Sequence, residues 1–165
     1  MRYGLLILLV VVQAASVCAQ STSVHEDRLN WYSTNYDEIQ RALEQGDDFL
    51  VIPLVLAVCE LWKSRDGAIG SEVAPAIARA LINQPSLTLH WFEDHPVDFE
   101  AWLDRMPYDL LTDYSGEWAN ELDSLRIALV SSLSEFALQT EDESLAQMAT
   151  DVARRAEDNG IRQID

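Results

Sequence analysis

The apolar residues of this chain recur at intervals of three and four, and no useful length of sequence alternates apolar and polar residues. The first stripe consists of Leu29, Tyr32, Tyr36, Ile39 and Leu43. This interval places side chains on one face of an α-helix, whereas a strand needs an interval of two. The spacing therefore predicts an all-α fold, either a single-domain helical bundle or a short α-solenoid-like array of antiparallel helices.

The most apolar stretch of the middle of the chain covers residues 49–62, where only Pro53 and Glu60 are not apolar. A helix that is apolar on all sides is either buried or spans a membrane, and this stretch is too short to span one. We therefore expect a central buried helix, in which Cys59 is a small core residue. Residues 48–65 and 71–83 are expected to form a pair of antiparallel helices.

Pro85, Pro96 and Pro107 are spaced by eleven residues. Proline favours the first position of a helix and pushes the preceding residue out of helical conformation. The spacing therefore predicts three short helices, each beginning at its proline.

Apolar stripes over residues 122–137 and 145–156 predict two longer helices in the last part of the chain. Thr140 and Glu143 have the T-x-x-E spacing of a capping box, in which each side chain bonds the other residue's backbone N–H. This pattern predicts that Thr140 starts the last helix.

The first residues have the pattern of a secretory signal peptide. Arg2 precedes the apolar run of residues 5–12, and Val17 and Ala19 are small residues at the positions that a signal peptidase recognises. We expect cleavage after Ala19, export to the periplasm or the extracellular space, and one helical domain over residues 20–165. The apolar run is too short to span a bilayer, and the exported chain would keep a single cysteine and form no internal disulfide.

The chain is strongly acidic, with 28 acidic and 11 basic residues and a net charge of −17. Removal of Arg2 with the signal peptide would leave ten basic residues and a charge of −18. Nucleic acids and anionic lipids bind through clustered Lys and Arg, so this composition argues against both and favours a basic partner. The alternative is that the acidity only keeps the protein soluble.

Acidic residues are densest over residues 93–123, where Arg105 alone opposes ten carboxylates and aromatic residues are interleaved. Carboxylates steer a basic partner, and exposed Trp and Tyr anchor it. The candidate contacts are Asp98, Glu100, Trp102, Asp104, Asp109, Asp113, Tyr114 and Glu117. We therefore expect a binding protein that holds, and in an inhibitor or immunity-type role neutralises, a basic protein or peptide. The alternative is that the acids are solvated and the aromatics form the core.

A second interpretation rests on the sequence HWFEDH, in which His90, Glu93 and Asp94 can share one helical face and bind a metal ion. A metal-dependent hydrolase would use His90 and Asp94. The two histidines, however, are five residues apart, whereas the helical zinc motif places them four apart. No nucleophile elbow, P-loop or dinucleotide turn is present, so no enzyme and no cofactor is predicted. A structural envelope protein is the third possibility, and the sequence gives no oligomeric state.

Overall fold

The structure, a computed structural model, describes residues 27–45, 48–65 and 68–164. The expected signal peptide, residues 1–19, lies outside the described residues, and its cleavage stays a prediction. The described residues belong to two compact units, which divide between Tyr36 and Asp37. In the first unit, residues 27–34 are helical and the rings of Tyr32 and Tyr36 meet edge to face, with centroids 5.8 Å apart.

The second unit is built from helices and two very short strands, which confirms the all-α class. The elements are α2 (Tyr36–Gln45), α3 (Asp48–Trp62), α4 (Ala68–Asn83), α5 (Pro85–Asp94), α6 (Pro96–Asp109), β1 (Thr112–Asp113), α7 (Ala119–Gln139), α8 (Glu143–Glu157) and β2 (Arg162–Gln163). None of the helices in the described ranges combines the length and apolar character that a bilayer crossing requires.

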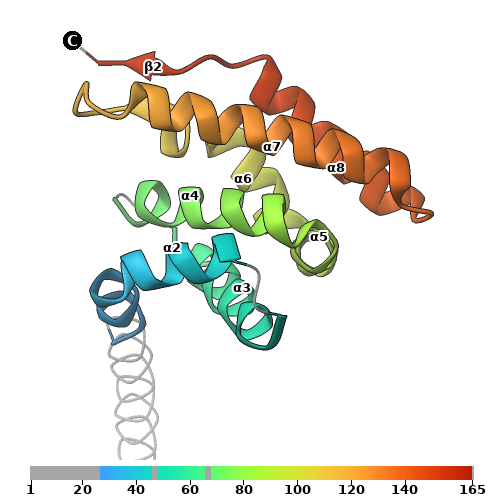
Figure 1. Cartoon of the computed structure of the whole chain (residues 1–165), viewed down its shortest axis with the longest axis horizontal. Coiled ribbons are helices and arrows are strands. Elements are labelled where there is room, and N and C mark those ends of the chain that lie inside the picture. Colours follow the sequence, from blue (N-terminus) through green and yellow to red (C-terminus); the bar gives the residue numbers. More distant parts are fainter. Residues whose placement is uncertain (1–26, 46–47, 66–67, 165) are drawn as a thin grey trace, which may run out of the picture. The chain divides into compact units, whose positions relative to one another are not determined.

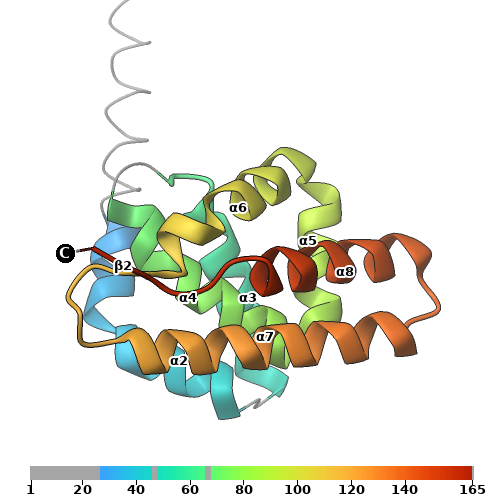
Figure 2. The ribbon, with the colours of Figure 1, turned by 90° about the horizontal axis from the view of Figure 1, so that it is seen from above.

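The helices of the second unit lie in layers (Figure 1). Helices α7 and α8 form a hairpin, lie side by side in both ribbon views and make up one outer layer (Figures 1 and 2). Helix α4 lies in the middle, because it packs against α7 on one side and against α3 on the other. Four of its alanines, Ala74, Ala76, Ala78 and Ala80, are buried, and small side chains let neighbouring helices approach closely.

The expectation that α3 is the buried central helix is wrong. One face of α3 packs inward through Val51, Val55 and Val58, but Ile52 and Leu56 on another face are exposed. A helix in an outer layer buries only the face that meets its neighbours, and α4 holds the central position instead. Nothing in the described part of the chain explains why the outer face of α3 is apolar.

Two of the three helices predicted to begin at a proline are confirmed, since α5 begins at Pro85 and α6 at Pro96. The third prediction is wrong, because Pro107 lies inside the last turn of α6. A proline lacks the N–H that would bond the carbonyl four residues earlier. That carbonyl belongs to Leu103, and it accepts a hydrogen bond from Nε of Arg155 in α8 at 3.1 Å instead. The replacement partner allows α6 to continue through the proline.

The predicted capping box is also wrong. Asp142, not Thr140, caps α8, because its carboxylate accepts hydrogen bonds from the backbone N–H groups of Ser144 and Leu145 at 2.9 and 3.1 Å. The Thr140 hydroxyl accepts from the N–H of Asp142 at 3.2 Å. Aspartate is among the strongest N-cap residues, and its negative charge also favours the positive end of the helix dipole.

The strands β1 and β2 pair in parallel, with Thr112 opposite Arg162 and Asp113 opposite Gln163. They join the segment that follows α6 to the segment that follows α8. Two residues per strand are too few to leave an alternating pattern, so periodicity could not predict this pairing.

Candidate functional site

Asp98 and Asp109, two of the predicted partner-binding acids, form ion pairs within the domain. The guanidinium of Arg65 donates to the Asp98 carboxylate. Nε of Arg105 donates to Oδ2 of Asp109 at 2.6 Å, and the Ser71 hydroxyl donates to Oδ1 at 3.3 Å. Both carboxylates are largely shielded from solvent. They join elements within the domain, and neither is free to contact a partner.

The side chain of Trp62 connects these two ion pairs. The guanidinium carbons of Arg65 and Arg105 lie 5.5 and 5.9 Å from its ring centroid, within the range of cation–π attraction. Its Nε1 donates to the backbone carbonyl of Asp98 at 3.1 Å, and Nη1 of Arg105 donates to the carbonyl of Arg65 at 3.0 Å. These contacts hold the end of α3 against α6.

Gly70 lets the first turn of α4 approach the Arg105–Asp109 pair. A Cβ atom at this position would lie 2.4 Å from Oδ2 of Asp109 and 2.6 Å from Nη2 of Arg105. Both distances are shorter than any relaxed contact, so a side chain here would displace the ion pair.

Asp113 fixes the conformation of the loop that leads into α7. Its carboxylate accepts four hydrogen bonds, from the N–H and hydroxyl of Ser115 and from the N–H groups of Gly116 and Trp118, at 2.9 to 3.0 Å. Gly116 has a φ of 77°, a conformation that costs glycine little. Burial by itself would raise the pKa of the Asp113 carboxyl, but the hydrogen bonds from Ser115, Trp118 and Gly116 together hold it below its usual value. Asp113 is buried and saturated, so it supports the loop and is not exposed to a partner.

Trp102 is fully buried, so the expectation that it anchors a partner is corrected. Its ring lies 6.1 Å from that of Phe92, centroid to centroid, in the core between α5 and α6. Sequence spacing could not distinguish the buried face of α6 from the exposed one, because both carry aromatic and acidic residues.

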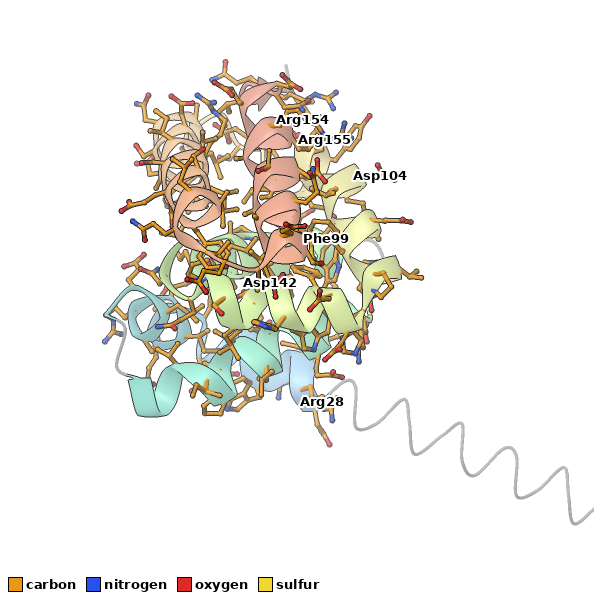
Figure 3. All side chains as sticks on the ribbon, turned by 90° about the vertical axis from the view of Figure 1, so that its right-hand side faces the viewer. Arg28, Phe99, Asp104, Asp142, Arg154 and Arg155 are labelled. Atoms are coloured by element: carbon orange, nitrogen blue, oxygen red, sulfur yellow. The ribbon has the colours of Figure 1, made fainter. Side chains whose placement is uncertain are left out.

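The other predicted contacts are exposed, but in two separate stretches of the chain. Glu100 and Asp104 lie on α6, where the Asp104 side chain is 84% exposed and one oxygen lies 3.8 Å from Nη2 of Arg155 (Figure 3). Tyr114 and Glu117 lie in the loop between β1 and α7. For these four residues, partner binding stays a prediction.

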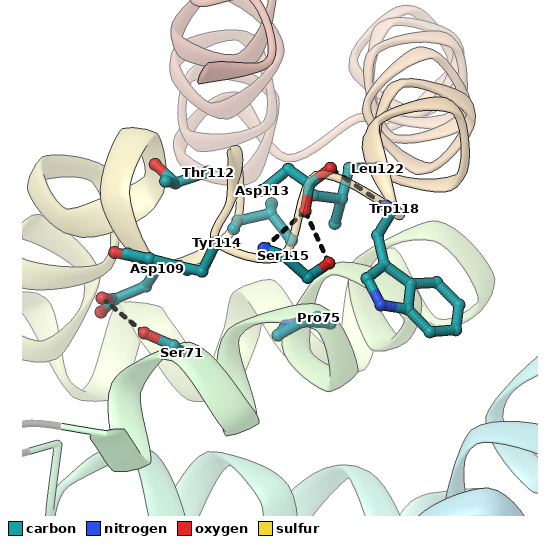
Figure 4. A pocket seen from close by; sticks show the side chains of 10 residues that line it. Ser71, Pro75, Asp109, Thr112, Asp113, Tyr114, Ser115, Trp118 and Leu122 are labelled. Atoms are coloured by element: carbon teal, nitrogen blue, oxygen red, sulfur yellow. Dashed lines mark hydrogen bonds between the residues drawn. The ribbon is translucent and has the colours of Figure 1, made fainter. Parts of the chain in front are cut away.

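A pocket of about 220 Å³ lies between α4 and the loop that Asp113 fixes (Figure 4). It is lined by Ser71, Pro75, Asp109, Leu110, Thr112, Asp113, Tyr114, Ser115, Trp118 and Leu122. Sites for small organic molecules usually have volumes of about 300–1,000 Å³. The pocket is smaller than that, mostly apolar and open on one side, so its size suits a single large side chain better than a cofactor.

Two of the residues that line this pocket, Tyr114 and Trp118, are exposed aromatic residues, and Tyr108 is linked to the first of them. Tyr108, Tyr114 and Trp118 are 56%, 61% and 57% exposed, and the Tyr114 hydroxyl donates to the carbonyl of Tyr108 at 3.2 Å. Glu117, which precedes Trp118 in the chain, and Glu121, three residues after it, are also exposed. We call these five residues the rim surface. The sequence showed Tyr108 and Trp118 only as members of an aromatic-rich stretch, and the turn-forming sequence DYSG was the local signal that could have placed them on a fixed loop.

The residues of the metal hypothesis are exposed on the last turns of α5. Nδ1 of His90 lies 2.8 Å from the carbonyl oxygen of Ser86, and because a carbonyl only accepts, Nδ1 donates there. Within the described ranges, no group of three His, Cys, Asp or Glu side chains is arranged to hold a metal ion, so Glu93 and Asp94 gain no support as ligands.

The thiol of Cys59 is a possible nucleophile, but this side chain is buried. Burial raises the pKa of its thiol to about 12, with a smaller contribution from the negative charge of Glu60. A thiol with this pKa is protonated at neutral pH and is a poor nucleophile.

The fold and the site define an all-α protein with a small surface pocket edged by exposed aromatic and acidic side chains. No family model matches the chain, and no curated protein or solved structure matches it either.

Proposed function

We propose that this protein is a non-catalytic binding protein that holds a basic protein or peptide on the rim surface. The observation that carries the proposal is that Tyr114 and Trp118 stand exposed beside a pocket of side-chain size, on a loop that the four hydrogen bonds of Asp113 hold in place. The proposal keeps the basic partner expected from the sequence and narrows its binding site from residues 93–123 to the rim surface.

The aromatic residues of the rim surface are of the type that anchors partners. Trp and Tyr dominate the binding energy of protein interfaces, because they bury a large area and lose little conformational entropy. The loop that presents them is already ordered, so binding loses less free energy to ordering than it would with a flexible loop.

The acids of the rim surface are free to attract a basic side chain. No basic side chain in the described part of the chain forms an ion pair with Glu117 or Glu121, whereas Asp98 and Asp109 are both paired. A long basic side chain could lie along Trp118 with its apolar stem and place its charge near these carboxylates. The strong negative charge of the whole chain would speed the encounter.

The test is the affinity for a basic probe, a short fluorescein-labelled peptide of alternating arginine and serine, measured by fluorescence anisotropy. Trp118→Ala should weaken binding by about 2 kcal/mol, or roughly 30-fold, as expected for an anchor residue. A peptide with glutamine in place of arginine should not bind, and added salt should weaken the binding of the arginine peptide.

Glu117→Lys and Glu100→Lys form a matched pair of charge reversals, because both residues are exposed glutamates that form no ion pair in the described part of the chain. Both change the net charge equally, so they weaken long-range attraction to a similar degree. Glu117→Lys should weaken binding several-fold more, since it also removes a contact. Equal effects of the two reversals, or unchanged binding in Trp118→Ala, would refute the rim surface as the binding site.

The proposal includes export of the protein, on the signal-peptide pattern of residues 1–19. The mass of the exported protein tests this directly. A chain that begins at Gln20 supports export by cleavage, and a chain that keeps residues 2–19 refutes it.

A further inference from the structure

The chain already places one of its own basic side chains on the rim surface. The guanidinium carbon of Arg162, in β2, lies 4.8 Å from the ring centroid of Tyr108. Arg126, Arg154 and Arg155 of the preceding helices all form ion pairs with carboxylates. Arg162 forms no ion pair with any side chain in the described part of the chain, and its charge meets an aromatic face instead.

The backbone of the same segment is held by strand pairing. The N–H of Arg162 donates to the carbonyl of Leu111 at 2.8 Å, and residues 162 and 163 pair in parallel with β1. Both residues are exposed, so the segment contributes little to the core. Backbone pairing of this kind binds an extended segment almost regardless of its sequence, and the side chains supply the selectivity.

We propose that the edge of β1 beside Tyr108 is a second subsite of the rim surface, that it takes an extended partner segment carrying Arg or Lys, and that residues 160–164 occupy it until the partner displaces them. This inference rests on the function proposed above and specifies how the basic partner binds. It follows from the contacts of Arg162, which are those that a basic partner would make.

Side chains alternate between the two sides of an extended segment, and this alternation predicts how the partner's side chains are arranged. Side chains two residues apart point to the same side of a strand, so Arg162 and Ile164 share one side. Ile164 is exposed. A partner segment that replaces this one is therefore expected to place its basic residue on the side that Arg162 occupies.

The arginine–serine peptide tests the inference in two variants of the full chain, Arg162→Ala and Arg154→Ala. Both substitutions remove one positive charge from an exposed side chain, so they strengthen long-range attraction equally. Only Arg162→Ala frees Tyr108, and it should bind the peptide about two- to five-fold more tightly than Arg154→Ala, because an exposed cation–π contact has that strength.

Two results separate a failure of this inference from a failure of the proposed function. If Trp118→Ala binds the peptide as the wild type does, the proposed function fails, and the inference with it. If binding depends on Trp118 but Arg162→Ala and Arg154→Ala bind equally, only the inference fails.

Hydrogen exchange gives a second readout that needs no substitution. The hydrogen bond to Leu111 should protect the amide of Arg162 in the free protein, and this protection should fall when the peptide saturates the protein. If the amide stays equally protected in the saturated complex, residues 160–164 are not displaced and the inference is overturned.

Discussion

Replacement of Gly70 by alanine tests the description of the Arg105–Asp109 ion pair. Helix propensity alone predicts that the substitution stabilises α4, because alanine is favoured over glycine in a helix by about 1 kcal/mol. The structure predicts the opposite, since the new Cβ would lie 2.4 Å from Oδ2 of Asp109 and 2.6 Å from Nη2 of Arg105. The sign of the change in stability therefore distinguishes the two arguments.

The expected magnitude follows from the burial of the two side chains. Removing one partner of a buried ion pair costs about 3–5 kcal/mol, because a charge is left without compensation. The Arg105 side chain is 34% exposed, and water would compensate part of the loss, so we expect about 2–3 kcal/mol here. After the gain in helix propensity, Gly70→Ala should lower the free energy of unfolding by about 1–2 kcal/mol.

Urea denaturation, followed by circular dichroism, measures this change in the free energy of unfolding. In thermal denaturation, the melting temperature should fall by roughly 2–8 °C. Gly160→Ala is the matched control, because no atom lies within 4 Å of a Cβ at that position. The control should change stability by no more than about 0.5 kcal/mol. If Gly70→Ala is as stable as the wild type or more stable, the ends of the Asp109 and Arg105 side chains move away from the new Cβ at little cost, and the expected loss of the ion pair is refuted.

Three further predictions concern single contacts. The thiol of Cys59, with its pKa raised to about 12, should react with a disulfide reagent near neutral pH only as fast as the protein unfolds, and rapid reaction of the folded protein would contradict its burial. Arg155→Ala should lower the free energy of unfolding by about 1 kcal/mol in the wild type, because the Leu103 carbonyl loses its hydrogen bond. The loss should be smaller in Pro107→Ala, where the restored backbone N–H can bond that carbonyl. Additive effects in this double-mutant cycle would contradict the exchange of one hydrogen bond for the other. Because the hydrogen bonds of Asp113 lower the pKa of its carboxyl, its ionised form stabilises the fold above the ordinary pKa and this contribution is lost as pH falls through the lowered value. The difference in stability between the wild type and Asp113→Asn should therefore narrow in acid, and a constant difference would refute the assignment.

The helices that the sequence predicts correctly are those whose signals are local. Pro85 and Pro96 start α5 and α6 because a proline at the first helical position loses no hydrogen bond. Pro107 carries the same local signal, but the partner that lets α6 continue comes from Arg155, far away in the sequence. A rule that sees only neighbouring residues cannot include such a contact.

The candidate site was predictable to a similar degree. Tyr114 and Glu117, two of the predicted contacts, are exposed, and the four-residue spacing of Arg105 and Asp109 could have shown that this acid is paired. The pairing of Asp98 with Arg65 depends on how α3 and α6 meet, and that arrangement has no local signature.

The parallel pairing of β1 and β2 also has a consequence for the order of folding. The whole hairpin of α7 and α8 lies between the two strands in sequence, so pairing them before both helices have formed would close a long flexible stretch of chain. Closing so long a stretch of chain costs much conformational entropy, and two residues of strand pairing form few hydrogen bonds to offset that cost. The pair is therefore expected to form after the helices during folding and to open before them, as the least stable cooperative unit of the domain.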